Sequence, residues 1–161
     1  GILTKAGVPL TWKSPSDFPV HQEYFNFTSK NIKTWISGTA THIRFRENDD
    51  KLSKVRQRNG VSPNFVHSLD AAALHKTVIK ANKEEGIYDF AFIHDSYGTH
   101  ATGCEALSKS LREVFISTFS VDLLRDWKHQ LEQASGLELP EPPEYGTADI
   151  SQIKNSTYFF S

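Results

Sequence analysis

One carboxylate in this sequence stands where it could hold a metal ion. Asp95 follows the apolar run Phe90–Ile93 and His94, and a second short extended stretch comes after it. This order predicts a β-hairpin that holds Asp95 rigidly at its tip with its oxygens exposed. Hard divalent cations prefer such oxygens, and two cations held by carboxylates can activate an attacking hydroxyl and stabilise a leaving pyrophosphate. Aspartate is also common in turns, so these residues alone leave a purely structural role open.

Helices are predicted on both sides of this hairpin. Before it, Ser62 can cap a helix, Pro63 suits a first helical position, and Gly86 stands where a left-handed C-cap belongs. After it, apolar residues recur at helical spacing in Leu107–Phe115 and again in Leu124–Leu131. The hairpin is therefore expected to rest on helices.

A second hairpin is predicted nearer the amino terminus. Ile32–Ile36 and Thr39–Phe45 are rich in β-branched and aromatic residues and flank Ser37 and Gly38, where glycine permits the positive φ of a tight turn. The charged interval Asn48–Arg58 predicts a short solvated helix or a loop.

The composition limits which classes of protein this chain can belong to. The 161 residues fit one domain, and 18 Lys and Arg against 19 Asp and Glu give a net charge of -1, so any nucleic-acid binding must come from local patches. The single cysteine, Cys104, cannot form an intramolecular disulfide and favours a reducing interior. No apolar run approaches the roughly 20 residues needed to span a bilayer, which excludes a membrane partner. The absence of methionine suggests a piece of a longer protein.

The sequence around Asp95 resembles motifs of a known protein family. FAFIHDSYGT at 90–99 closely resembles the catalytic hairpin, often called motif C, of bacteriophage-type and mitochondrial DNA-dependent RNA polymerases, and PNFVHSLD at 63–70 resembles the helix before it. LTW, FPV and QEY resemble another signature of this family, in the correct order. Family A DNA polymerases share a His-Asp hairpin but usually follow it with glutamate, whereas Ser96-Tyr97-Gly98 is similar to the RNA enzymes. The resemblance covers nearly the whole chain.

The resemblance implies an α+β fold, in which a small antiparallel palm-like sheet with the motif C hairpin packs against helices as part of a polymerase hand. It divides the chain into three parts. Residues 1–62 form a fingers-side extended region with a specificity hairpin at about 25–46. Residues 63–134 form the palm helix, the motif C hairpin and the following helices. Residues 135–161 form a Pro-rich connector and a carboxy-terminal foot.

The resemblance also implies roles for individual residues. Asp95 would be one of two catalytic aspartates that bind Mg²⁺ in the full-length enzyme, and His94 would shape the hairpin tip near the growing RNA end. His67 matches a position that contacts the minor groove of the template–product duplex, where an imidazole can donate to acceptors that every sequence presents.

The segment 25–46 corresponds in position to the family's specificity hairpin, which enters the major groove of promoter DNA. A charged, solvated ribbon would look similar, so both interpretations stay open. Arginine suits guanine, and both basic residue types neutralise phosphates. The basic residues expected to contact promoter DNA are Lys30, Lys33, Arg44 and Arg46.

The implied reaction is template-directed addition of ribonucleotides from NTPs to the 3′ end of an RNA product, on template DNA. The second aspartate and the nucleotide-binding helix lie upstream in the family, and no stretch here resembles them. We therefore expect the chain to be inactive without the remainder of the polymerase chain. The implied location is the cytoplasm of an infected bacterial host, or else a mitochondrial or plastid interior.

Three alternatives remain at this stage. One is a piece of a family A DNA polymerase. Another is a non-catalytic nucleic-acid-binding module, for which the nearly neutral net charge predicts weak, strongly salt-dependent association at most. The third is a metal-dependent phosphohydrolase, in which His94 and Asp95 would join His42, His67 and His75. In that architecture the His-Asp pair stands on helices, whereas a strand-like run precedes it here.

Overall fold

The computed structural model describes residues 2–93 and 95–159. Those residues form helices and small antiparallel strand pairs, which is compatible with the predicted α+β class. In chain order the elements are α1 (Ile2–Ala6), β1 (Leu10–Lys13), β2 (Pro19–Gln22), β3 (Phe25–Ile36), β4 (Thr39–Leu52), α2 (Lys54–Glu85), β5 (Ala91–Ile93), β6 (Ser96–Gly98), η1 (Ala101–Gly103), α3 (Cys104–Phe119), α4 (Leu123–Ser135) and η2 (Ile150–Asn155).

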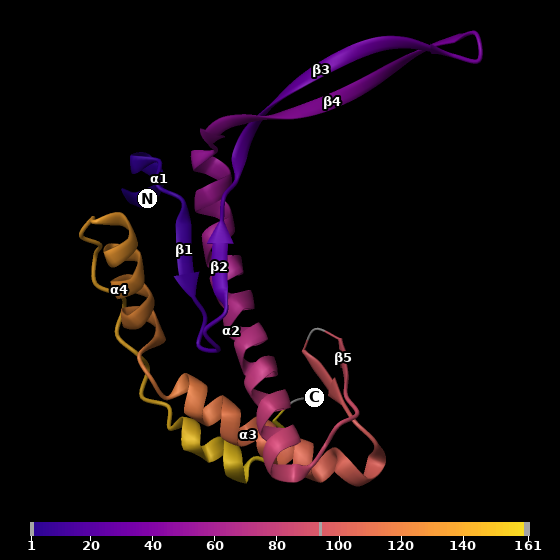
Figure 1. Ribbon diagram of the computed structural model, residues 1–161. Helices are drawn as coiled ribbons and strands as arrows, with labels where there is room; N and C mark the ends of the chain where they lie inside the picture. The colour runs from indigo at the N-terminus through magenta and orange to yellow at the C-terminus, as the bar shows by residue number, and fades with distance from the viewer. Residues whose placement is uncertain (1, 94, 160–161) are drawn as a thin grey trace.

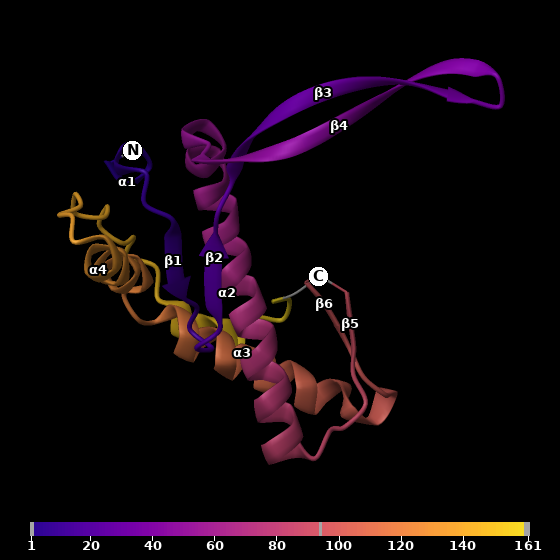
Figure 2. The same ribbon diagram turned by 45° about the horizontal axis from the view of Figure 1, so that its top comes forward.

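The other elements are arranged along α2, the longest helix (Figure 1). Its 32 residues give a length of about 48 Å. The β1–β2 pair contacts α2 through β2 and α4 through β1, and α3 packs against α2 farther along. The β3–β4 ribbon projects away from one end of α2, whereas the β5–β6 hairpin lies beside the other end in both views (Figures 1 and 2).

Within the described residues the strands form three separate two-stranded antiparallel sheets, with order β1-β2, β3-β4 and β5-β6. The antiparallel pairing of the predicted palm-like sheet is therefore found, but the hairpin that carries Asp95 joins neither of the other pairs. Its stability has to come from packing against helices, because an isolated two-stranded hairpin is marginal in water.

Helix α2 begins earlier than Ser62 and Pro63 suggested, so that part of the prediction is wrong. Ser53 is the N-cap, and its hydroxyl accepts a hydrogen bond from the backbone N–H of Arg56 at 3.5 Å. Pro63 lies inside the helix on its exposed face, where water can satisfy the carbonyl that proline leaves without a donor. The predicted end is confirmed, since Gly86 adopts the left-handed conformation at φ 66°.

The ribbon is longer than predicted. Strand β4 continues to Leu52, and α2 starts at Lys54, so the helix or loop predicted for Asn48–Arg58 is instead the end of a strand followed by the first turns of a long helix. The turn itself is confirmed: Ile36 pairs with Thr39, and Ser37 and Gly38 both have positive φ, at 50° and 80°. Two positive φ angles are typical of the type I′ turn that suits the strand twist.

The described residues form two hydrophobic clusters. In the larger one, Phe65 of α2 stacks on Trp127 of α4 with ring centroids 4.1 Å apart, and the Trp12 indole N–H donates to the Ser68 hydroxyl at 3.1 Å. This cluster joins β1, α2 and α4. The smaller cluster centres on Ala81, Ile87 and Leu107 and lies under the β5–β6 hairpin. Among the described helices, none combines the length and apolar character that crossing a bilayer requires.

The carboxy-terminal segment returns to α3. Residues 136–149 have no regular structure, as expected for the proline-rich connector. The Arg112 side chain of α3 donates to the backbone carbonyls of Ile153 and Ser156, and its guanidinium lies 5.4 Å from the Phe159 ring centroid. Phe159 meets Phe115 edge-on at 4.9 Å. Arg112 thus closes the carboxyl end of η2, where the last carbonyls lack helical donors.

Replacement of Arg112 by alanine should loosen this segment without unfolding the chain. Hydrogen bonds from a charged donor contribute about 2 kcal/mol, so the opening equilibrium of residues 150–159 should rise roughly 30-fold. Amide hydrogen exchange resolved by segment measures this change. Arg125→Ala, on the exposed side of α4, serves as the control. Equal protection of residues 150–159 in both variants would contradict the prediction.

Candidate active site

Asp95 occupies the turn between β5 and β6. Ile93 pairs with Ser96, so two residues connect the strands, and the carboxylate of Asp95 is exposed. The sequence-based prediction of an exposed hairpin carboxylate is therefore confirmed. His94, the other residue of the turn, lies outside the described residues.

Aromatic packing holds the hairpin in place. Phe90 stacks on Phe92 with centroids 5.3 Å apart, and Phe92 meets Tyr97 edge-on at 5.1 Å. Phe90 and Tyr97 also pack against the smaller hydrophobic cluster, which includes Leu107 of α3. At the open end of the hairpin, the Thr99 hydroxyl donates to the Asp89 carbonyl at 2.7 Å. These contacts fix the strands on both sides of the turn.

A cavity of about 360 Å³ lies between the turn of the hairpin and α3. Asp95, Ser96 and Tyr97 line it on one side, and α3 lines it on the other. The α3 residues are Cys104, Leu107, Ser108 and Leu111. The carboxylate therefore lies at the rim of a partly polar hollow.

Negative charge gathers around Tyr97. Burial, followed by the charges of Asp70 and Asp95, raises the pKa of the Tyr97 phenol above its ordinary value. The phenol is therefore protonated at neutral pH. Asp70 belongs to α2, and its effect on Tyr97 places the Asp70 side of that helix toward the hairpin. Sequence reasoning assigned no role to Asp70, although its three-residue spacing from His67 was visible.

His67 lies on the same face of α2 as Asp70, because residues three apart are neighbours on a helix. Both side chains are exposed. The predicted duplex-contacting histidine thus shares a side of α2 with Asp70, whose charge acts on Tyr97 of the hairpin. The basic residues of the ribbon lie apart, beyond the opposite end of α2 (Figure 1).

The two faces of the β3–β4 ribbon differ in chemistry. Residues directly opposite in an antiparallel pair share a face, and the register pairs Lys33 with His42, Asn31 with Arg44 and Ser29 with Arg46. We call this the cationic face. The other face presents Ile32 opposite Ile43, and we call it the apolar face. It also carries Lys30, Ile36, Phe45 and Glu47, together with Thr28, Thr34, Thr39 and Thr41.

The register separates the predicted basic residues. Lys33, Arg44 and Arg46 share the cationic face, whereas Lys30 lies on the apolar face in an ion pair with Glu47. That pair raises the pKa of Lys30 and lowers the pKa of Glu47, in each case mainly through their hydrogen bond. Lys30 thus already has an anionic partner.

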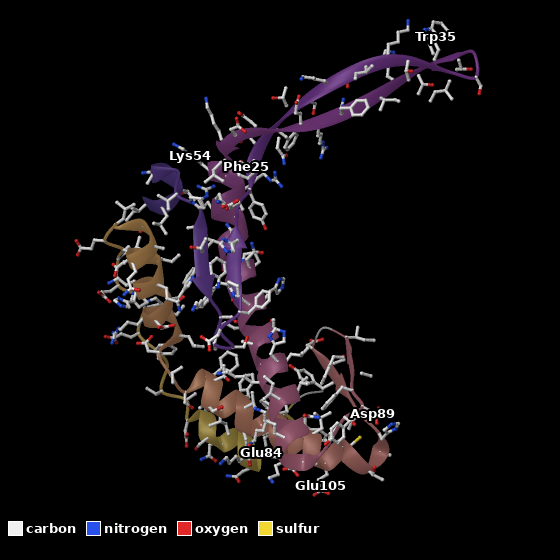
Figure 3. All side chains as sticks on the ribbon, viewed as in Figure 1. Phe25, Trp35, Lys54, Glu84, Asp89 and Glu105 are labelled. Carbon is white, nitrogen blue, oxygen red and sulfur yellow. The ribbon has the colours of Figure 1, made fainter. Side chains whose placement is uncertain are left out.

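Aromatic rings are interleaved with the cations. The Arg46 guanidinium lies 4.9 Å from the Phe27 ring centroid, and the Lys33 ammonium lies 5.6 Å from the Trp35 centroid. Arg44 Nε donates to Asn31 Oδ1 at 3.3 Å. Trp35, near the tip, is 67% exposed and projects from the ribbon in Figure 3. The cationic face therefore combines positive charge, hydrogen-bond donors and exposed ring surface.

The carboxylate chemistry fits a hard cation, but the site is incomplete. Asp95 offers exposed oxygens on a supported turn, the type of ligand that Mg²⁺ prefers. Within residues 2–93 and 95–159, no group of three or more His, Cys, Asp or Glu side chains gathers to hold a metal ion. Asp95 can therefore be one ligand of a metal site whose other ligands come from elsewhere.

Comparison with known proteins identifies the family. A family model described as DNA-dependent RNA polymerase matches residues 3–136. The chain belongs to this family. It is 35% identical to DNA-directed RNA polymerase 1A of Nicotiana tabacum, over 99% of this chain and 100% of that relative.

Longer relatives match as well. Identity is 35% to the mitochondrial DNA-directed RNA polymerase 1 of Nicotiana sylvestris, over 99% of this chain and 16% of the relative. It is 33% to T7 RNA polymerase of Escherichia phage T7, over 100% of this chain and 19% of the relative. The polymerase chain therefore spans less than a fifth of these two enzymes. Phage, mitochondrial and chloroplast enzymes are all among its relatives, which are nucleotidyltransferases.

Family membership decides between the alternatives. The matching family is that of RNA rather than DNA polymerases, as the residues after Asp95 indicated. The phosphohydrolase alternative required the His-Asp pair on helices, but in this polymerase chain Asp95 lies on a hairpin turn. His42 is on the ribbon and His75 on α2, where its Nδ1 lies 3.2 Å from the Ser16 hydroxyl.

Replacing Asp95 by asparagine should lower the pKa of Tyr97. The substitution removes one of the negative charges that disfavour the phenolate, while burial, the larger cause, remains. The Tyr97 pKa should therefore fall but stay above the ordinary tyrosine value. Titration of ¹³C-labelled tyrosine by NMR measures it. Asp89→Asn is the matched control, and an equal Tyr97 pKa in both variants would contradict the prediction.

Proposed function

We propose that this chain supplies the Asp95 hairpin to the active site of a DNA-directed RNA polymerase, which adds ribonucleotides to an RNA 3′ end on template DNA. The observation that carries the proposal is the exposed carboxylate of Asp95 on a two-residue turn, supported by aromatic packing. We assign the hairpin, α2 and α3 to the palm of the polymerase hand. The family relationship supports this assignment.

Asp95 is the residue that would hold Mg²⁺. A pair of bound Mg²⁺ ions would activate the 3′ hydroxyl of the RNA and stabilise the pyrophosphate that leaves the NTP. Two ions need more than one carboxylate, and Asp95 stands without a cluster of further metal-ligating side chains in the described part of the chain. The second aspartate must then come from the remainder of the polymerase chain, and this chain alone is inactive.

His67 is proposed to contact the product duplex. Its exposed imidazole lies on the same face of α2 as Asp70 and can donate a hydrogen bond to minor-groove acceptors. A·T and T·A pairs both present acceptors there, so this contact tolerates changes of sequence. Such tolerance suits an enzyme that copies any template.

The cationic face of the ribbon is proposed to contact promoter DNA. A two-stranded ribbon fits the major groove, where arginine can recognise guanine and basic residues neutralise phosphates. We assign this contact to Lys33, Arg44 and Arg46. Lys30 is left out because it is paired with Glu47 on the opposite face.

Asp95→Asn should abolish nucleotide addition in a polymerase that contains this chain. A metal ion contributes several kcal/mol to transition-state stabilisation, so the rate of primer extension with Mg²⁺ should fall on the order of 10³-fold. Asp89→Asn removes the same charge from an exposed pair with His100 and should leave the rate within about twofold. The 161-residue chain alone should extend no primer. Comparable rates for the two variants would disprove the proposal.

Replacing Lys33, Arg44 and Arg46 together by alanine should weaken promoter binding by the same polymerase. Each lost phosphate contact lowers the slope of log affinity against log salt by about 0.9. We expect a loss of roughly 10- to 1000-fold in promoter affinity, measured by fluorescence anisotropy at several salt concentrations. Lys30→Ala, on the opposite face, is the control and should bind normally. If Lys30→Ala weakened binding as much as the triple variant, the face assignment would be wrong.

A further inference from the structure

The ribbon joins the body of the protein at Tyr24, the residue before β3. Its backbone carbonyl accepts a hydrogen bond from the Ser53 N–H at 2.6 Å, at the start of α2. Arg56 Nη1 donates to the Phe25 carbonyl at 3.0 Å. Phe25 and Lys54, labelled in Figure 3, mark this root, where both ribbon strands meet the amino-terminal end of α2.

The Tyr24 ring packs against a row of residues along one face of α2, which we call the stripe. Arg56, Gly60 and Asn64 are four residues apart and therefore share one helix face. A Cβ atom at Gly60 would lie 2.5 Å from Tyr24 Cε2, so only glycine leaves room for the ring at its present position. The Arg56 guanidinium is 5.2 Å from the ring centroid, and Asn64 Nδ2 donates to the Tyr24 hydroxyl at 2.9 Å.

A buried polar network fixes this stripe to β2. Asn64 also donates to Gln22 Oε1 at 2.8 Å, and both amide hydrogens of Gln22 bind Gln57, through its side-chain and backbone oxygens. Gln57 Nε2 returns a hydrogen bond to the Gln22 carbonyl at 2.8 Å. Each glutamine is only 1% exposed. Satisfied buried networks of this kind rigidify a structure and specify one arrangement.

We propose that Tyr24, seated on Gly60, is a positioning residue that sets the direction in which the ribbon projects. The inference rests on the proposed DNA contact of the cationic face. Twelve residues in β3 give a ribbon of about 40 Å, so a 10° change at the root displaces the tip by about 7 Å. Lys33 and Arg44 lie about 20 to 26 Å from the root, so the same rotation moves them by about 3 to 5 Å, which takes them off the groups they would contact. The packing of the Tyr24 ring against Gly60 therefore determines which promoter contacts are made.

Gly60→Ala tests the proposal directly. The added methyl group displaces the Tyr24 ring, while alanine is a better helix former than glycine, so α2 itself is not weakened. Gly146→Ala is the matched control, because a Cβ there meets open space. Tyr24→Phe, which keeps the ring and loses only the hydrogen bond to Asn64, is a milder second variant in case the first fails to fold.

The ribbon direction can be measured on the 161-residue chain without any polymerase assay. One spin label is attached to Cys104, the single cysteine and an exposed one, and another to Thr39→Cys at the ribbon tip. Double electron–electron resonance measures the distance between the two labels. Its distribution should be shifted for Gly60→Ala, broadened for Tyr24→Phe and unchanged for Gly146→Ala. Unchanged distributions in the first two variants would overturn the proposal, whatever the function of the chain.

The functional consequence is measured in a polymerase that contains the chain. Gly60→Ala should lower promoter affinity at least tenfold and leave extension of a primer on a promoter-free template within about twofold, since the Asp95 hairpin lies at the other end of α2. An equal loss of promoter affinity and of primer extension would overturn the positioning role, because it would show that the substitution disrupts the whole fold. If the ribbon shifts but promoter affinity stays normal, Tyr24 does set the ribbon direction, and the proposed DNA contact of the cationic face is wrong instead.

Discussion

The rigidity of α2 fixes the separation between the ribbon and the Asp95 hairpin. At its amino-terminal end, hydrogen bonds between Gln57 and Gln22 hold the helix to β2 and to the ribbon root. At its carboxyl end, Gly86 turns the chain toward the hairpin, and Ala81 packs in the cluster beneath it. A helix that continues through Pro63 without interruption transmits the position of one end to the other. Two sites with different chemistry are thus held at a set distance by a single element.

Features governed by local rules could be predicted from the sequence. Ser37 and Gly38 form the expected tight turn, Gly86 ends α2 as its conformational freedom suggests, and Asp95 stands on a hairpin turn because polar residues interrupt an apolar run. In each case a few neighbouring residues determine the backbone conformation. The candidate metal ligand was therefore accessible to sequence reasoning.

Features that depend on distant contacts could not be predicted. Pro63 is a common signal for the start of a helix, but the Gln22–Gln57 hydrogen bonds stabilise helical structure several residues before it. The separation of Lys30 from Arg44 and Arg46 requires the strand register, which the sequence alone leaves open. Asp70 gained significance only when the fold brought its charge close to Tyr97. Among the described residues no group of three or more His, Cys, Asp or Glu side chains gathers, so neither the sequence nor the fold of this part of the chain points to a complete set of metal ligands.

The charge distribution explains why composition alone does not reveal the cationic face. A net charge of -1 averages over a ribbon that gathers Lys33, Arg44 and Arg46 on one face and a body that carries acidic and basic side chains together, as where Lys80 pairs with Glu84 and Glu113. Fields near a surface depend on the local arrangement of charges rather than on their sum. A cationic face can therefore exist within a nearly neutral chain.

The apolar face of the ribbon has a consequence for handling the protein by itself. Ile32, Ile36 and Phe45 are each about half exposed, and a two-stranded ribbon has unpaired backbone groups along both outer edges. Exposed apolar side chains next to open edges favour strand addition between molecules. Lys30 and Glu47 interrupt the apolar face with charge, which opposes such stacking. Purified at high concentration, the chain will therefore tend to self-associate through its most extended part.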